Sequence, residues 1–258
     1  MSVLWDPALV SADLVDLTRA LGEPNRDLAI LAEGNTSELM ADGRLVVKTS
    51  GSNMQRATAE DFVSVEVQPL LQLMLDPESA QTDLSTVLDA GEHAGKRRRA
   101  SIETLIHVAV QAIFPVRFVG HSHPTDVVAL MASIHAETAY DHAAYSDEAV
   151  VIGQPLHVPY SQPGMALGRL SYEVLRKHAQ TGREVPSLIT LGNHGIVALA
   201  DTADAVEGIS AMAVKSARVR LGAYAAGGVQ HIPDDSVASF FAREDVVERR
   251  GHLAGRVD

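Results

Sequence analysis

The 258-residue sequence contains no cysteine. This absence excludes disulfide bonds and thiolate metal ligands, so a transition metal could be held only by histidine and carboxylate side chains. Basic residues are scarce as well, because 21 lysines and arginines stand against 33 aspartates and glutamates and leave a formal net charge of -12. That balance argues against nucleic acid or an anionic membrane as the main partner. We therefore expect a small-molecule substrate.

Two kinds of apolar segment are also missing. The N-terminus lacks a basic region followed by an apolar stretch, and no uninterrupted apolar run approaches the roughly 20 residues that cross a bilayer. We therefore expect a cytoplasmic protein that does not bind membranes. With 46% hydrophobic residues, no internal repeat and no clear linker, the chain is predicted to form one domain over residues 1–258.

Apolar residues recur at helical spacing in some segments and at strand spacing in others, and the two kinds alternate. This pattern predicts helices at 7–22, 69–75, 100–114, 124–133, 164–182 and 202–226, and strands at 28–34, 62–67, 116–122 and within 187–200. Asp42-Gly43 predicts the turn of a hairpin within 34–51. Residues 148–160 are predicted to be extended. The polar stretch 76–99 predicts an inserted loop with at most one helical turn, and its basic run 96–99 a solvated segment.

Two histidines stand at the end of one predicted strand, in "VRFVGHSHP". Side chains at positions i and i+2 of a strand project from the same face, so His121 and His123 are expected side by side, within reach of one metal ion. Two partly exposed polar residues at a strand end are the alternative. His194 lies in a predicted turn between two buried strands, where a solvent-seeking ring is not needed. Three neutral imidazoles would leave the fourth position of a tetrahedral zinc open, as in catalytic sites.

Glu103, in "ASIETLIH", is the candidate acid or base. Ser101 is predicted to cap the helix, which places Glu103 in the first turn, where the helix dipole favours its charge. Glu103 is therefore either a capping carboxylate or, if the helix start faces the histidines, the group that moves a proton. His107 shares its helix face one turn later, and we interpret it as a packed histidine that supports the site rather than a ligand.

Two loops rich in small residues, "EGNTS" and "KTSGSN", offer groups that bind anions. Backbone N–H groups, hydroxyls, the amide of Asn35 and the ammonium of Lys48 together suit a phosphate or carboxylate. Such turns are common, so a turn without a ligand is the alternative.

The motifs "GNTS", "TSGS", "SIETLIH", "HSHP" and "NHG", in this order and at these separations, resemble the class II aldolase/adducin family. The resemblance runs from about Leu31 to Ala200. It implies a three-layer α/β/α fold around a central, mainly antiparallel sheet. It also implies a homo-oligomer, usually a tetramer, with active sites near subunit contacts.

The same resemblance implies a role for each matching residue. His121, His123 and His194 would bind a divalent ion, usually zinc, and Glu103 would be the acid/base glutamate. Four further positions match those that hold a substrate phosphate in the family: Asn35, Ser50, Gly51 and Ser101.

The activity implied is that of a lyase that cleaves a C–C bond of a keto-sugar or keto-sugar phosphate by retro-aldol chemistry, through a metal-stabilised enediolate. Tyr140 or Tyr145 would protonate the departing aldehyde oxygen, in some members from the next subunit, and the sequence does not choose between them. Decarboxylation of a 3-oxo sugar acid leaves the same type of enediolate and is the alternative reaction. A non-catalytic, adducin-like interaction module is the alternative class, and the retained histidines and glutamate argue against it.

The chain also departs from the family pattern. Ile102 stands where many phosphate-binding members have a second serine, which removes one hydroxyl from the anion pocket, and Lys48 can replace part of that contact. "VKTSG", "SIETLIH" and "PYSQPG" are closer to the aldolase portion of a rhamnulose-phosphate aldolase/dehydrogenase fusion than to fuculose-phosphate aldolase. We expect no dehydrogenase portion, since no G-x-G-x-x-G turn follows a strand here.

Overall fold

The computed structural model describes residues 3–253 of the chain. Its helices are α1 (Ala12–Leu21), α2 (Val67–Leu75), α3 (Gln81–Val87), α4 (Thr104–Ile113), α5 (Thr125–Met131), α6 (Ser146–Val151), α7 (Met165–Gln180), α8 (Ala203–Ala225), α9 (Asp234–Phe241) and α10 (Glu244–Leu253). Its strands are β1 (Asn35–Leu39), β2 (Arg44–Lys48), β3 (Phe62–Glu66), β4 (Asp89–His93), β5 (Lys96–Arg99), β6 (Phe118–Ser122), β7 (Leu156–Val158), β8 (Leu188–Leu191) and β9 (Gly195–Ala200).

Seven strands form the central sheet, in the order β3-β2-β1-β6-β9-β8-β7. Neighbouring strands run antiparallel except for β7 and β8, which are parallel. The predicted hairpin within 34–51 is present as β1 and β2. The sheet is therefore mainly antiparallel, as the resemblance implied.

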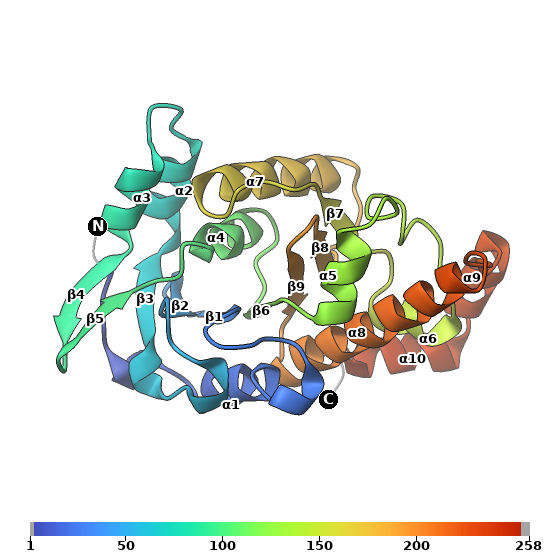
Figure 1. Ribbon diagram of the computed structural model, residues 1–258, viewed down its shortest axis with the longest axis horizontal. Coiled ribbons are helices and arrows are strands. Elements are labelled where there is room, and N and C mark those ends of the chain that lie inside the picture. The colour runs from blue at the N-terminus through green and yellow to red at the C-terminus, as the bar shows by residue number, and fades with distance from the viewer. Residues whose placement is uncertain (1–2, 254–258) are drawn as a thin grey trace.

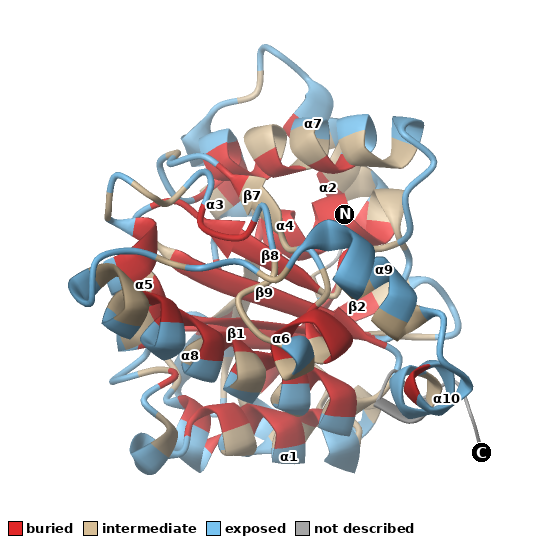
Figure 2. Ribbon diagram, turned by 90° about the vertical axis from the view of Figure 1, so that its right-hand side faces the viewer, coloured by how far each residue is buried: buried red, intermediate tan, exposed pale blue. Residues whose placement is uncertain are grey.

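Helices cover both faces of this sheet, with α2, α4 and α7 on one face and α1, α5 and α8 on the other (Figure 1). Figure 2 shows the buried strands between the two helical layers. Each face has its own apolar core, and successive residues of a strand alternate between the two. Leu45 and Val47 of β2 pack on the α4 side, for example, whereas Val46 packs on the α1 side. The predicted α/β/α architecture is confirmed.

The register of the central strands brings distant segments to one end of the sheet. Asn35, which begins β1, pairs with His121 of β6, and His121 pairs in turn with Val197 of β9. The turn from β8 into β9 carries His194 to the same end, with Asn193 in a left-handed conformation at φ 50°.

The two outer strands of the sheet have little free edge. Leu4 pairs with Ser64 of β3 through two backbone hydrogen bonds of 2.9 and 2.8 Å. At the opposite edge, β7 has only three residues and lies between Pro155 and Pro159.

The strand predicted at 28–34 was wrong, because this segment is a turn. Asp27 and Leu31 both have φ 53°, which strand residues do not adopt, and the Glu33 backbone N–H donates to the Ile30 carbonyl at 3.0 Å. Two of its three large apolar side chains face solvent, with Ile30 61% and Leu31 82% exposed, whereas Leu28 is buried. The run of apolar residues alone was therefore not sufficient to predict a strand at 28–34.

The inserted loop predicted at 76–99 was also wrong, because the segment contains α3 and the hairpin β4–β5. Ala94 and Gly95 form its two-residue turn with φ 51° and 72°. The basic run 96–99 is strand β5 rather than a solvated loop. Its Arg98 is buried, forms ion pairs with Glu60 and Asp61, and lies over the ring of Trp5. Ion pairs hold this hairpin where apolar alternation is missing.

Residues 148–160 are extended only in part, since α6 occupies their beginning and β7 follows. Glu148 in α6 is buried and accepts hydrogen bonds from Arg220 and Ser216 of α8, each at 2.5 Å.

Between residues 3 and 253, no helix combines the length and apolar character that a membrane crossing requires.

The contact between α4 and α7 supplies a test of the packing. A Cβ added at Gly168 would lie 2.6 Å from Leu105 Cβ, so Gly168→Ala should force the helices apart and lower the free energy of unfolding by about 1–3 kcal/mol. At Gly222 of α8 an added Cβ meets no atom within 4 Å, so Gly222→Ala should leave stability unchanged or raise it by up to about 1 kcal/mol. Urea unfolding of both variants is the measurement, and equal effects would contradict the packing.

Candidate metal centre

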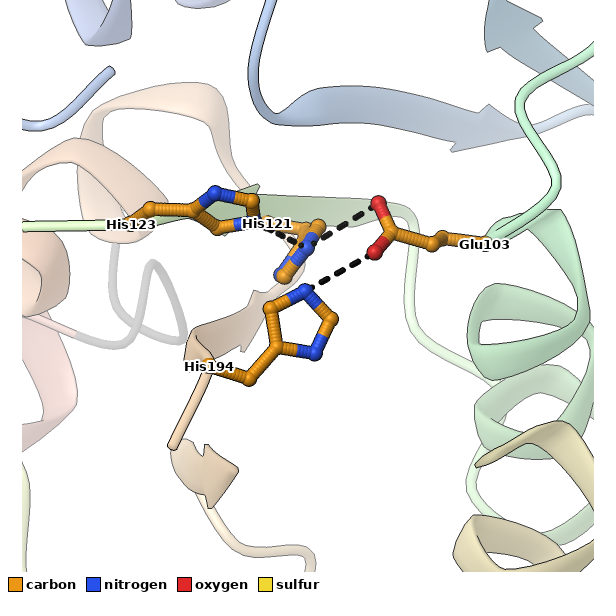
Figure 3. Close-up of side chains that lie close together, drawn as sticks. All are labelled: Glu103, His121, His123 and His194. Carbon is orange, nitrogen blue, oxygen red and sulfur yellow. Dashed lines mark hydrogen bonds and ion pairs between the residues drawn. The ribbon is translucent and has the colours of Figure 1, made fainter. Parts of the chain in front are cut away.

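Four side chains from separate parts of the chain meet at one end of the sheet (Figure 3). His121 lies in β6 and His123 one residue beyond its end, while His194 lies in the turn between β8 and β9. Glu103 precedes the first residue of α4 and points toward the histidines. One ligand atom from each residue lies within 4.8 Å of the others.

The distances within this group are short. His121 Nε2 is 2.9 Å from His123 Nε2 and 3.2 Å from Glu103 Oε2, and His194 Nε2 is 2.8 Å from Glu103 Oε1. Zinc binds nitrogen and oxygen at about 2.0–2.2 Å, which places tetrahedral ligands roughly 3.3 Å from one another. These three separations, 2.9, 3.2 and 2.8 Å, are slightly shorter than that spacing, and every pair of ligand atoms lies within 4.8 Å.

Hydrogen bonding also fixes which nitrogen of His121 faces the group. Its Nδ1 is 2.8 Å from the carbonyl oxygen of Ile196, which can only accept, so Nδ1 carries a hydrogen and Nε2 is the nitrogen that faces the group. Two imidazole nitrogens 2.9 Å apart and a carboxylate are then satisfied by a cation between them. The donor set, three imidazoles and one carboxylate without sulfur, fits a divalent metal.

The electrostatics of the group are strongly coupled. Burial alone would raise the pKa of Glu103, but the neighbouring His121 and hydrogen bonds from His121 and His194 outweigh it and hold that pKa below its ordinary range. Burial and the two neighbouring imidazoles lower the pKa of His123 to about 3. At neutral pH Glu103 is therefore ionised and His123 is neutral, which are the forms that bind metals.

Asn35 and Ser101 hold the carboxylate of Glu103 in place. Asn35 Nδ2 donates to Glu103 Oε2 and to Ser101 Oγ, each at 3.2 Å. Ser101 Oγ accepts the backbone N–H of Glu103 at 3.3 Å, but α4 begins only at Thr104. Glu103 is thus the residue at the helix boundary, not a first-turn residue as predicted, and its side chain turns to the histidines instead of capping the helix.

A cavity of about 270 Å³ opens beside His123 and His194. Asp27 and Glu33 contribute carboxylates to its lining, and neither was predicted as a site residue. Glu33 Oε1 lies 3.9 Å from His123 Nδ1. The signal for Glu33 was its position directly before the "GNTS" motif, and the wrong strand at 28–34 concealed it. A larger cavity of about 780 Å³ lies at the opposite end of β6 and β9 and contains no predicted site residue.

The predicted anion-binding residues are less closely grouped. Asn35 and Ser101 contact Glu103, whereas Ser50 and Gly51 lie in an exposed loop after β2. The backbone N–H of Ser50 already donates to the Arg99 carbonyl at 2.8 Å. Lys48 is fully buried, and its ammonium donates to the Thr49 carbonyl at 3.2 Å.

The two candidate tyrosines lie away from the cluster. Tyr140 is buried beneath the guanidinium of Arg220, 4.5 Å from the ring centroid, and the Tyr145 hydroxyl donates to the sulfur of Met212 at 3.1 Å. Burial raises the pKa of both to about 12. Within one chain, neither hydroxyl is hydrogen-bonded to the four clustered side chains among the described residues.

Comparison with known proteins identifies the class to which this fold and site belong. A sequence model of the class II aldolase and adducin N-terminal domain matches residues 12–221. The chain belongs to the class II aldolase/adducin family. No curated protein matches it in sequence.

Solved structures share this fold. An L-fuculose 1-phosphate aldolase from Glaciozyma antarctica PI12 has a TM-score of 0.63 and 19% identity, with 94% of this chain and 88% of that chain covered. YgbL from Klebsiella pneumoniae, described as a candidate aldolase/epimerase/decarboxylase, has a TM-score of 0.67 and 18% identity over 93% of this chain and 99% of that chain. The N-terminal class II aldolase domain of a Thermoplasma acidophilum protein has a TM-score of 0.60 and 23% identity over 81% and 92%.

Buried Lys48 should make stability depend on pH. Burial lowers its pKa from 10.5 to about 8, so between these values the unfolded chain binds a proton that the folded chain lacks. Stability therefore rises with pH across this window, by about 3 kcal/mol at most for the whole difference. Lys48→Met lacks this contribution, so the free energy of unfolding of the wild type relative to the variant should rise over that range. A constant difference in urea unfolding would contradict the burial of the amine.

Proposed function

We propose that this chain is a divalent-metal-dependent lyase that cleaves a C–C bond of a keto-sugar or keto-sugar phosphate by retro-aldol chemistry. The observation that carries the proposal is the convergence of three imidazole Nε2 atoms and the Glu103 carboxylate beside an open cavity. His121, His123 and His194 are the proposed metal ligands. A divalent ion held there, zinc in the simplest case, would act as a Lewis acid on the ketone oxygen of the substrate.

Glu103 is the proposed acid/base. Retro-aldol cleavage removes a hydroxyl proton, breaks the C–C bond with its electron pair left on the carbon next to the ketone, and returns a proton to that carbon. A carboxylate that moves a proton must lie within hydrogen-bond reach of the reacting atom, next to the group that stabilises the charge. The hydrogen bond from Asn35, which orients Glu103 toward the histidines, supports this assignment.

The substrate-binding part of the proposal rests on fewer contacts. Asn35 and Ser101 already meet at Glu103, and we assign Ser50, Gly51 and Lys48 to the anion or hydroxyl groups of the substrate on the family motif alone. We also propose a homotetramer. Exposed Ile30 lines the cavity beside exposed Leu31, and a subunit contact there would bury both.

Decarboxylation of a 3-oxo acid is the second candidate, supported by the structural similarity to YgbL. It would use the same charge stabilisation at a ketone oxygen, with carbon dioxide as the leaving fragment. A screen of keto-sugar phosphates and 3-oxo acids with added metal separates the two, because aldehyde release identifies the lyase and carbon dioxide release the decarboxylase. Metal binding without turnover on either set would favour a non-catalytic module.

Metal content tests the ligand assignment. Protein purified with zinc should contain about one ion per chain, and His123→Ala should lose most of it because one of three imidazoles is removed. His178→Ala serves as the matched control, since His178 lies at the end of α7 and its ring N–H donates to the Glu184 carbonyl at 2.9 Å. Elemental analysis that finds stoichiometric metal in His123→Ala would remove this residue from the ligand set.

Glu103→Gln separates chemistry from structure. The amide keeps the shape of the side chain but cannot act as the base, so turnover should fall by on the order of 100-fold or more while metal content stays near normal. Turnover, metal content and melting temperature are measured on one preparation. Near-normal turnover with a lowered melting temperature would assign Glu103 a structural role only.

A further inference from the structure

We propose that the hydrogen bond between Ser37 and His107 sets the position of Glu103, and that His107 is a positioning residue for the reaction. The proposal rests on the role of Glu103 proposed above. Ser37 Oγ lies 2.6 Å from His107 Nδ1, a short contact between β1 and the middle of α4.

His107 is unusual in its surroundings. All residues of α4 from Thr104 to Gln111 are buried, and His107 is 0% exposed. Its Nε2 has no hydrogen-bond partner within the described part of the chain. A leucine would fill this place without burying a polar group, so packing alone does not account for the imidazole. Burial and the nearby His121 lower its pKa to about 3, which keeps the ring neutral at physiological pH.

The contacts between β1 and α4 form a two-point clamp. Asn35 bonds to Glu103, and two residues along the strand Ser37 bonds to His107, four residues along the helix. Two residues of a strand span about 6.8 Å and four residues of a helix about 6 Å, and both steps keep the side chains on one face. The two bonds therefore form together in a single register of the helix on the strand.

The apolar contacts of α4 do not set that register. Its opposite side packs against α7 through Leu105 and Gly168, an apolar contact that resists separation but has no directional hydrogen bond. β1 is also the strand whose Asn35 pairs with His121. The clamp thus positions Glu103 relative to the same strand that pairs with the strand of His121. Loss of the Ser37 bond should let Glu103 move relative to the histidines while the core stays packed.

Cobalt(II) titration of the purified protein without substrate tests this, because the visible spectrum of the bound ion reports the groups around it without any turnover, and the Glu103 carboxylate is one of the four donor groups at the site. Ser37→Ala and His107→Leu should each change the spectrum and lower kcat by on the order of 10-fold, with KM within about twofold. The double variant should be no worse than either single variant, since both remove one interaction. In His107→Asn the side-chain amide lies near the position of Nδ1 and can bond to Ser37, so this variant should keep the wild-type spectrum and most of kcat, unlike His107→Leu.

Gln111→Leu is the matched control. Gln111 is buried one turn further along α4, and its amide bonds to the backbone of Val116 instead of β1. Its loss should lower stability and leave the cobalt spectrum and kcat unchanged. An unchanged spectrum in Ser37→Ala and His107→Leu alike, or an equal change in Gln111→Leu, would overturn the positioning role. If the wild type cleaves no substrate, the proposed function fails while the spectra still decide the clamp.

Discussion

The antiparallel register of β1, β6 and β9 is the constraint on which the rest of the site depends. It places Asn35 opposite His121 and brings the turn that carries His194 to the same end of the sheet. A slip of one residue in β6 would turn His121 to the opposite face. The backbone positions of His121 and of the turn that carries His194 are therefore set by the hydrogen bonds of the sheet.

Several buried polar groups lie around this end of the sheet. Asn35 Oδ1, Thr104 Oγ1, His107 Nε2 and Ser122 Oγ are buried without partners among the described residues, and Lys48 keeps a buried amine nearby. A sequence selected for stability alone would remove such groups, because each buried unpartnered atom costs about 1–3 kcal/mol. Other buried atoms without a partner lie elsewhere, in Arg98 and Arg220 for example, but the grouping of four such atoms next to the clustered side chains is typical of a region shaped by function.

Local patterns predicted what depends on local geometry. The shared face of His121 and His123 follows from the two-residue period of one strand, and the long helices follow from apolar spacing. The approach of His194 and Glu103 depends on strand pairing and helix packing between segments far apart in the sequence, so the residues alone could only suggest it through the family resemblance. The hairpin β4–β5 was not predicted because its strands lack the alternation of apolar and polar residues that indicates a strand, and ion pairs of Asp89 and Arg98 stabilise it instead. The turn at 28–34 escaped it because left-handed Asp27 and Leu31 carry no glycine signal.

The treatment of the two sheet edges limits how copies of this chain can associate. A free strand edge invites another chain to extend the sheet, with aggregation as the risk. Here Leu4 of the N-terminal segment pairs with Ser64 of β3, and the three-residue β7 is flanked by a proline on each side. A strand from another chain would therefore find fewer free backbone hydrogen-bonding groups at either edge. Any stable assembly must then form through the helical layers and the loops at the ends of the strands. The four clustered side chains lie at one end of the strands, so an assembly that used the loops there would share its surface with the site.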